Sequence, residues 1–155
     1  MFKTLEKLRN LLKAEFGDEI KKYFIDDPNL IPMSMLPCFA VTPISTEINV
    51  ADTGRDQYTY SVDIYFIISA LRELKKYNEE MVGARKLAEI MEKRDSDGNL
   101  DEHTVLYVLR NNLTLGSNWM INNISSIDYG IRPRPEQGIT KEAACRLEVI
   151  RIKNR

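Results

Sequence analysis

The sequence has only one histidine and two cysteines among 155 residues, which limits the chemistry that it can support. Any catalytic triad or multi-histidine metal site would have to be built around His103, which we expect to be a solvated surface residue. Cys38 and Cys145 lie in apolar, strand-like segments, where free cysteines are usually buried. We therefore expect reduced core thiols and a reducing compartment, with a disulfide between them as the alternative.

The sequence also lacks an excess of charge and a long hydrophobic run. Its 22 Lys and Arg residues nearly balance its 23 Asp and Glu residues. Such a balance does not favour strong phosphate binding by counterion release, although it leaves a local basic patch open. No segment approaches the run of about 18 apolar residues that spans a bilayer. Lys3, Glu6 and Lys7 interrupt the amino terminus too early for a signal peptide. We expect a soluble protein without a membrane partner.

No motif typical of an enzyme or a nucleotide-binding site is present: GxSxG, HExxH, CxxC and Walker-type loops are all missing. The segment DSDGNLD alternates oxygen-bearing side chains like a calcium loop, but Leu100 and Leu106 stand where that loop needs glycine and glutamate. A helix stop at Gly98 and an N-cap at Asn99 or Asp101 explain every residue of the segment. We expect no metal, no cofactor and no catalytic residues. A small metal-dependent enzyme is the less favoured alternative.

What the sequence does contain is one long alternation of apolar and polar residues, which predicts a half-buried strand. Its apolar positions are Tyr58, Tyr60, Val62, Ile64, Phe66 and Ile68. At about 3.4 Å per residue this strand would run roughly 40 Å, about twice the usual length. Part of it is expected to project beyond its own core and to need a neighbouring chain. This favours an assembly subunit over a catalyst.

The first third of the chain predicts a helix followed by extended segments. Apolar residues step by three and four through residues 2–16, and Gly17 follows as a helix stop. A short strand at residues 20–25 is expected before the proline-rich stretch 26–37, which we expect to be an ordered surface connection. The apolar parity of residues 38–50 changes at Pro43, which predicts a bulge or a bend.

The middle third predicts a hairpin turn and two helices. Residues 52–56 join the strand before them to the long strand, because Gly54 tolerates a positive φ. Asn78 is the expected N-cap of the first helix. Its buried stripe is expected to be Met81, Ala84, Leu87, Ala88 and Met91. A shorter helix follows Asp101. Its inward residues are expected to be Val105, Leu106, Val108 and Leu109.

The last third returns to alternation and predicts a second hairpin. The first strand carries Trp119, Ile121, Ile127, Tyr129 and Ile131, and the second carries Ala143, Cys145, Leu147 and Val149. Residues 132–138 interrupt the two. The order of elements predicts a single α+β domain over residues 1–155. Its antiparallel β-sheet is expected to consist of two long hairpins with helices packed on one face.

Taken in order, the chain resembles the tail terminator (tail-completion) proteins of long-tailed bacteriophages and phage-derived particles. The resemblance covers most of the chain, from the opening helix to the closing strand. It rests on degenerate patterns and not on a signature motif. These patterns are LPCFAV at 36–41, YTYSVDIYF at 58–66, VLRNNLTLG at 108–116, IDYG at 127–130 and ACRLEV at 144–149. In that family the fold is an α+β domain with helices on one side of an antiparallel sheet, which agrees with the order of elements expected here.

The resemblance implies a structural virion protein and not an enzyme. Members of the family form a homo-oligomeric ring, commonly a hexamer, that caps the tail tube, ends its polymerisation and joins the tail to the head connector protein. The implied partners are the tail tube protein, the connector and, in contractile tails, a sheath protein, and DNA passes through the ring only as cargo. The implied place is the tail or neck of the virion, after assembly in the host cytoplasm. A head-completion or connector subunit of the same neck is the alternative.

The family has no catalytic residues to transfer, so the expected interface residues are local hypotheses. Gly54, Arg55 and Asp56 lie at one predicted hairpin tip. Arg132, Arg134 and Glu136 lie at the other. Each trio is a candidate contact with the tube or with a neighbouring subunit. The alternative is that each tip is a plain solvated turn.

Overall fold

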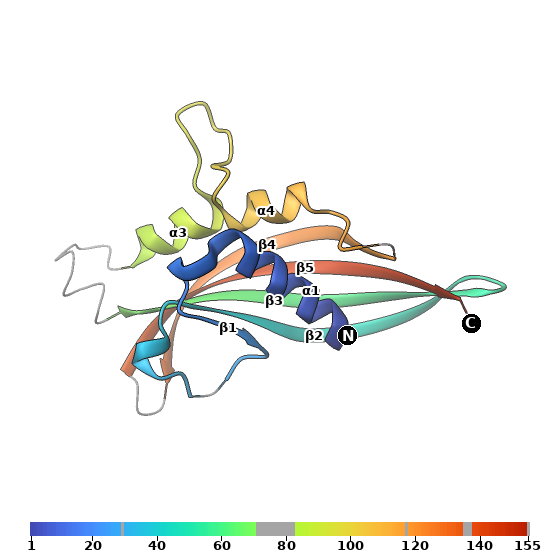
Figure 1. The fold of residues 1–155 in the computed structure, drawn as a ribbon, viewed down its shortest axis with the longest axis horizontal. Coiled ribbons are helices and arrows are strands. Elements are labelled where there is room, and N and C mark those ends of the chain that lie inside the picture. Colours follow the sequence, from blue (N-terminus) through green and yellow to red (C-terminus); the bar gives the residue numbers. More distant parts are fainter. Residues whose placement is uncertain (29, 71–82, 117, 135–137, 155) are drawn as a thin grey trace.

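The computed structural model describes residues 1–28, 30–70, 83–116, 118–134 and 138–154, and it has the expected α+β architecture. These residues form a five-stranded sheet and three α-helices (Figure 1). The helices are α1 (Phe2–Phe16), α3 (Ala84–Glu92) and α4 (Val105–Asn111). The strands are β1 (Lys22–Ile25), β2 (Cys38–Asp52), β3 (Arg55–Ser69), β4 (Trp119–Arg134) and β5 (Gly138–Asn154). No described helix is long and apolar enough to cross a membrane.

The sheet is mixed, which corrects the expectation of a purely antiparallel one. Its strand order is β1-β2-β3-β5-β4, and the last four strands pair antiparallel along their length. The short strand β1 pairs parallel to β2, from Lys22 opposite Cys38 to Ile25 opposite Val41. The proline-rich connection after β1 is long enough to return the chain to the end of the sheet where β1 began, and this makes the pairing parallel. The β2–β3 and β4–β5 hairpins lie side by side through the β3–β5 pair.

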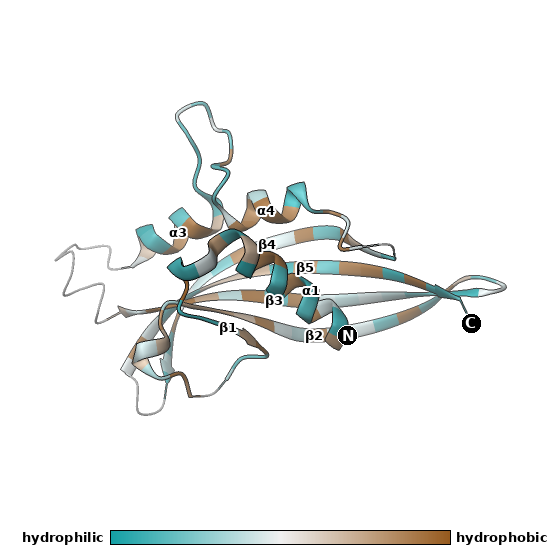
Figure 2. Ribbon diagram, in the orientation of Figure 1, coloured by the Kyte–Doolittle hydropathy of each residue, from teal (hydrophilic) through white to brown (hydrophobic). Residues whose placement is uncertain are grey.

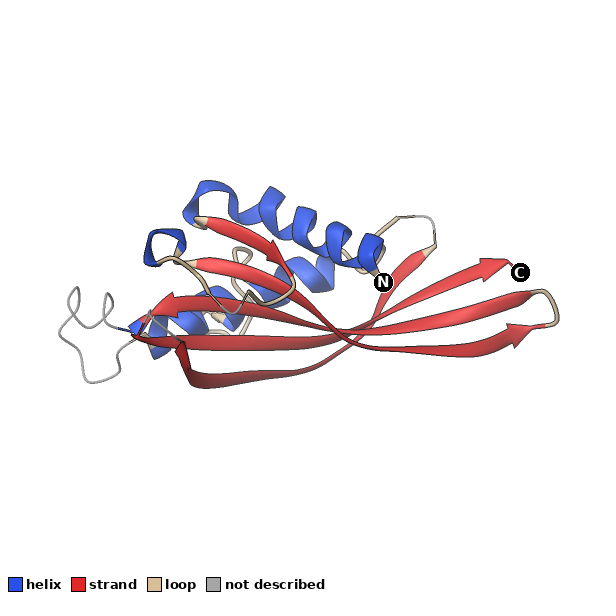
Figure 3. Ribbon diagram, turned by 90° about the horizontal axis from the view of Figure 1, so that it is seen from below, coloured by secondary structure: helices blue, strands red, loops and turns tan. Residues whose placement is uncertain are grey.

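The three helices cover one side of the sheet, here called the helix face (Figure 3). The helix α1 spans the predicted residues, and it ends at Gly17, whose φ of 47° lies in the left-handed region. Its buried residues Leu5, Leu8, Leu12 and Phe16 join a core with even-numbered residues of β3 and odd-numbered residues of β5. Buried residues of α3 and α4 belong to the same core as those of α1, and Figure 2 shows hydrophobic and hydrophilic residues alternating along these helices.

The predictions for α3 and α4 need corrections at their starts. Val105, Leu106, Val108 and Leu109 are buried in α4 as expected. The N-cap of α4 is Thr104, whose Oγ1 accepts a hydrogen bond from the Tyr107 amide, and not Asn99 or Asp101. In α3, Leu87 and Met91 are buried, but Ala84 is exposed at the first turn. The predicted N-cap Asn78 and the stripe residue Met81 lie outside the described residues.

Bulges explain the changes of apolar parity along β2 and β4. The register of β2 shifts between Pro43 and Ser45, so the irregularity expected at Pro43 is confirmed. The register of β4 shifts twice, between Ile121 and Asn123 and between Ile124 and Ser126. Two shifts restore the original parity, and Ile121 and Ile127 therefore share the helix face even though they are separated by bulges.

The proline-rich segment 26–37 covers part of the opposite face of the sheet. It contains a 3₁₀ helix at Met33–Met35, and it buries Ile31 and Leu36 against Cys38, Ala40 and Ile67. It is therefore more than a surface connection, because it supplies a small second core. Both cysteines are free and buried. They lie in different clusters, Cys38 in this second core and Cys145 in the main one.

Candidate interaction surface

The turn end of the β2–β3 hairpin extends past the helices, with the end of β5 beside it (Figure 1). We call residues 45–59 the projecting ribbon. The strand β1 pairs only with Cys38–Val41 of β2. In the described part of the chain, no strand pairs with the outer side of residues 42–52, which we call the β2 edge. An unpaired edge presents main-chain donors and acceptors to another strand.

The β2 edge also carries exposed aliphatic side chains. Ile48 is 62% exposed and Val50 is 69% exposed. The register places Ile48 opposite Tyr58, which packs against the main core, so both aliphatic side chains belong to the helix face. On β3 the Tyr58 and Tyr60 rings stack at a centroid distance of 6.2 Å. The apolar stripe of the core therefore continues onto the projecting ribbon, where no described helix covers it (Figure 2).

The predicted tip residues Gly54, Arg55 and Asp56 do lie at the turn of this ribbon. The Asp52 carboxylate accepts hydrogen bonds from the Gly54 amide at 2.9 Å and from Arg55 Nε at 2.6 Å. The Arg55 guanidinium and the Gly54 amide lower the pKa of Asp52. Gly54 and Arg55 are exposed, and Asp56 is half-buried. The Arg55 guanidinium is thus paired with the Asp52 carboxylate across the turn.

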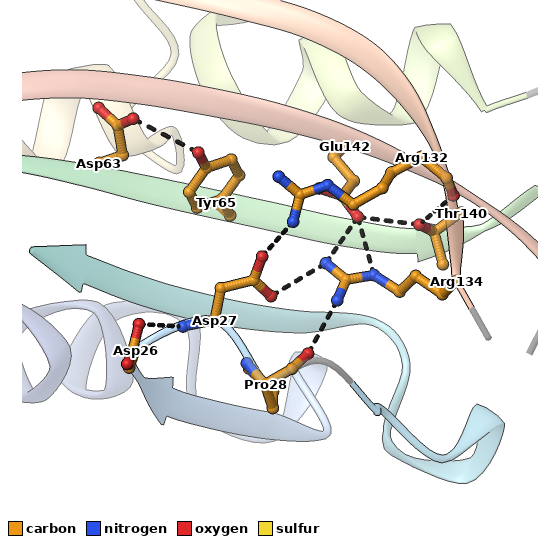
Figure 4. A network of polar contacts seen from close by, with 9 residues as sticks. All are labelled: Asp26, Asp27, Pro28, Asp63, Tyr65, Arg132, Arg134, Thr140 and Glu142. Atoms are coloured by element: carbon orange, nitrogen blue, oxygen red, sulfur yellow. Dashed lines mark hydrogen bonds and ion pairs between the residues drawn. The ribbon is translucent and has the colours of Figure 1, made fainter. Parts of the chain in front are cut away.

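Two residues of the second predicted trio, Arg132 and Arg134, do not lie at a loop tip. Arg132 and Arg134 are residues of β4, and Glu136 lies outside the described residues. The Arg134 side chain is only 3% exposed. Its guanidinium contacts Glu142 at 2.7 Å and Asp27 at 3.0 Å, and it donates to the Pro28 carbonyl at 2.8 Å (Figure 4).

Arg132 and Thr140 complete this network. The Arg132 guanidinium donates to Asp27, lies 3.6 Å from Glu142 and packs over the Tyr65 ring at 5.6 Å. Thr140 Oγ1 donates to the Glu142 carboxylate at 2.8 Å. The network fastens segment 26–37 to the opposite face of the sheet, and this is a structural role. Sequence reasoning did not identify Asp27 or Glu142 as members of this network. The only signal in the sequence is that Glu142 occupies a polar position in an alternating strand.

The outer side of β4 is the other long edge of the sheet. Its first residues are covered by the preceding segment, because the Leu115 amide donates to the Trp119 carbonyl and the Ile121 amide donates to the Leu113 carbonyl. Residues 123–134, which we call the β4 edge, have no partner strand on that side among the described residues. Tyr129 and Ile131 on this edge are 46% and 65% exposed.

An apolar cleft of about 460 Å³ separates the β4 edge from α3. Leu87 and Ala88 line one wall, and Tyr129 and Ile131 line the other. The Tyr129 hydroxyl donates to the Glu92 carboxylate at the end of α3. Burial and this carboxylate raise the pKa of Tyr129. The apolar walls of the cleft suit aliphatic side chains.

The segment that resembles a calcium loop is a turn closed by its own hydrogen bonds. The Asp95 Oδ1 accepts from the Asp97 and Asn99 amides, both at 2.9 Å, and the bonds to Asn99 and its neighbours lower the pKa of Asp95. Within the described ranges, no group of three or more His, Cys, Asp or Glu side chains is placed to hold a metal ion.

The single histidine links two elements of the fold and is partly exposed. The His103 ring lies 3.4 Å from Glu15 and 3.2 Å from Glu19, and it packs against Phe16. These contacts connect the end of α1 to the segment before α4. No hydroxyl or thiol nucleophile is hydrogen-bonded to the ring in the part of the chain that the structure describes.

Comparison with known proteins adds no assignment: no protein-family model matches this chain, and no curated protein matches it significantly.

Proposed function

We propose that this chain is a structural subunit of a long-tailed phage or phage-derived particle, a tail terminator that forms a ring on the end of the tail tube. The observation that carries the proposal is the projecting ribbon. Its β2 edge carries both main-chain groups without a partner strand among the described residues and aliphatic side chains. Ile48 and Val50 are both more than 60% exposed. The sequence resemblance supplies the biological setting.

The physics of the ribbon supports assembly. Natural proteins usually shorten, charge or cover their edge strands, because a long apolar edge pairs with other chains. Burial of an aliphatic side chain such as Ile48 stabilises a complex by roughly 1.5–3 kcal/mol. A head-to-tail contact between identical chains closes into a ring when its rotation allows closure. A subunit of this shape is therefore better suited to a ring than to an isolated monomer.

The proposed partners follow from the proposed place in the particle. One face of the ring meets the tail tube protein, and the other meets the head connector protein, with a sheath protein outside where the tail is contractile. The formal net charge of -1 leaves DNA free to pass through the lumen without tight binding. The Asp95 turn and His103 take no part in this function.

The test measures the mass distribution of the purified chain, alone and with tubes assembled from the tail tube protein of the same genome. We expect rings in solution or rings that form on tube ends, with electron microscopy showing a cap at one end of each tube. A chain that stays monomeric and leaves the tube ends bare would contradict the proposal.

Deletion of the gene separates the terminator from the alternative connector role. Without a terminator, tails become overlong or ragged beside full heads. Without a connector, heads leak and contain little DNA. Full heads with tails of normal length would exclude both roles.

A further inference from the structure

We infer that neighbouring copies join by antiparallel pairing of the β2 edge of one copy with the β4 edge of the next, centred on Ile48 and Ile131. The inference deepens the proposed function and rests on it, because it specifies the contact that builds the ring. It starts from the positions of the two edges. The β2 edge lies toward the hairpin turn, and the β4 edge lies on the other side of the sheet, away from that turn. A head-to-tail contact needs two different surfaces of this kind.

The direction of the strands allows this pairing. Each of the successive pairs β2–β3, β3–β5 and β5–β4 is antiparallel, so β4 runs opposite to β2 within one copy. A second copy placed beside the first in the same orientation would therefore present an antiparallel β4 to the β2 edge. The two sheets would continue as one, with all helices on the same side.

On both edges, the main-chain N–H and C=O groups of the helix-face residues point outward, toward the strand that would pair with them. The Val41 carbonyl accepts a hydrogen bond from Asp26 beside β1, so helix-face residues of β2 point their main-chain groups outward. The Trp119 carbonyl accepts a hydrogen bond from the Leu115 amide, so helix-face residues of β4 also point their main-chain groups outward. A bulge shifts side-chain face and main-chain direction together, so the rule extends past the bulges to Ile48 and Ile131.

One register satisfies the side chains on both faces. With Ile48 opposite Ile131, Val50 falls opposite Tyr129 on the helix face, beside the apolar cleft under α3. On the opposite face, Glu47 then falls opposite Arg132, whose side chain is 45% exposed. Aliphatic side chains thus meet an apolar cleft, and a carboxylate meets a guanidinium.

Two prolines limit the pairing at its ends. In this register Pro133 lies opposite Thr46, and it has no amide hydrogen to donate. Pro43 ends the available part of the β2 edge in the same way. If the register shifted by two residues in either direction, Arg132 would no longer lie opposite Glu47. The paired segment is therefore residues 46–50 against residues 129–133.

A pair of introduced cysteines tests this register. Asn49 falls opposite Gly130 on the opposite face, in a pair whose main-chain groups point away from each other. Such pairs hold their Cα atoms about 4.5 Å apart, within the range of a disulfide. A Cβ added at Gly130 meets no atom within 4 Å, so Gly130→Cys is sterically tolerated. The native thiols are buried and should not react.

We expect the double variant Asn49→Cys/Gly130→Cys to form disulfide-linked multimers under mild oxidation, with most chains linked and monomers recovered on reduction. Asn49→Cys/Asn123→Cys is the matched control, because Asn123 lies on the same face of β4 but about 20 Å further along. It should show only background linkage. Each assay is run on the chain alone and on the chain bound to tube ends.

The outcomes separate this inference from the proposed function. Rings without linkage in the Asn49/Gly130 variant would overturn the pairing and leave the terminator proposal standing. Linkage in the single variant Asn49→Cys would indicate a two-fold β2–β2 contact and would also overturn the pairing. Monomers throughout, including in the presence of tubes, would overturn both.

Discussion

Arg134 and Glu142 form a buried ion pair across the β4–β5 hairpin, with 2.7 Å between guanidinium nitrogen and carboxylate oxygen. Their side chains are 3% and 7% exposed. Asp27 and Thr140 bind the same two groups from segment 26–37 and from β5. The pair therefore holds segment 26–37 against the opposite face of the sheet.

Replacement of Arg134 by methionine should strongly destabilise the fold. It leaves the Glu142 and Asp27 carboxylates without their main cation in a buried place, and breaking such a pair costs about 3–5 kcal/mol. Chemical denaturation monitored by circular dichroism measures the change in the free energy of unfolding. Arg55→Ala is the control, since the exposed pair with Asp52 should contribute nothing measurable. Equal stability of the two variants would refute the structural role of Arg134.

The aliphatic residues of the projecting ribbon should matter for assembly and not for folding. The double variant Ile48→Lys/Val50→Lys places two charges on side chains that are already exposed in the single chain. Surface changes of this kind alter the free energy of unfolding by about 0.5 kcal/mol or less. We expect loss of rings and of tube capping, measured by mass photometry, whereas the unfolding midpoint of the dilute monomer should be unchanged.

Ala14→Lys is the matched control for the ribbon variant, because it adds a lysine at an exposed position of α1, away from both edges. Normal assembly is expected for this control. If the ribbon variant assembles normally as well, Ile48 and Val50 do not take part in the contact.

Sequence patterns predicted the parts of the fold that depend on local periodicity. The helix of residues 2–16, the bulge after Pro43 and the buried side of α4 follow from spacing alone, because one face of each element meets the core. The short strand expected before segment 26–37 is present as β1, but its parallel pairing with β2 could not be predicted in the same way. Its pairing depends on the path of segment 26–37, which is a tertiary property.

The candidate surface was predictable only in part. Alternation identified the long strand, so a projecting ribbon was expected, and its tip at Gly54 is where the pattern placed it, although Gly54 does not adopt the positive φ on which the turn prediction rested. Arg132 and Arg134 were assigned to a loop tip because prolines flank them. Edge strands tolerate proline, and the bulged strand β4 continues through Pro133 to Arg134. The carboxylates that bind these arginines are more than 100 residues away at Asp27, or eight to ten residues away at Glu142, and no local pattern links them.

The N-cap of α4 gives a local test of stability. The Thr104 hydroxyl accepts a hydrogen bond from the Tyr107 amide, and Thr104 is fully buried. Thr104→Ala should lower the free energy of unfolding by about 1 kcal/mol, and Thr104→Ser should retain most of it. Thermal denaturation of the three proteins measures the difference. Equal losses in both variants would show that packing of the threonine methyl group matters more than the cap.

Calcium, magnesium and manganese should leave the unfolding temperature unchanged. The Asp95 carboxylate already accepts main-chain and side-chain hydrogen bonds within its own turn. A ligand that binds the folded state raises its stability by mass action, so binding would appear as a shift that grows with the ion concentration. Such a shift that Asp95→Asn removes would restore the metal-dependent alternative.

The buried thiols predict a loss of stability at alkaline pH. Burial raises the pKa of Cys38 and of Cys145 to about 12, from values near 9 in the unfolded chain. Above pH 9 the unfolded chain releases these protons while the folded chain keeps them. The unfolded state is therefore favoured as the pH rises from about 9 toward 12. For two thiols the free energy of unfolding should fall by about 1–2 kcal/mol between pH 9 and pH 10.

The double variant Cys38→Ala/Cys145→Ala separates the thiols from the other groups that titrate in this range. Its stability at pH 8 is expected to be lower, because two buried side chains become smaller, but the decrease from pH 9 to pH 10 should be much shallower than in the natural chain. The raised pKa of Tyr23, at about 12, affects both proteins equally and acts mainly above pH 10. Denaturant unfolding at each pH gives the two slopes. If the slopes are the same, other groups control the alkaline transition, and the thiols ionise equally in both states.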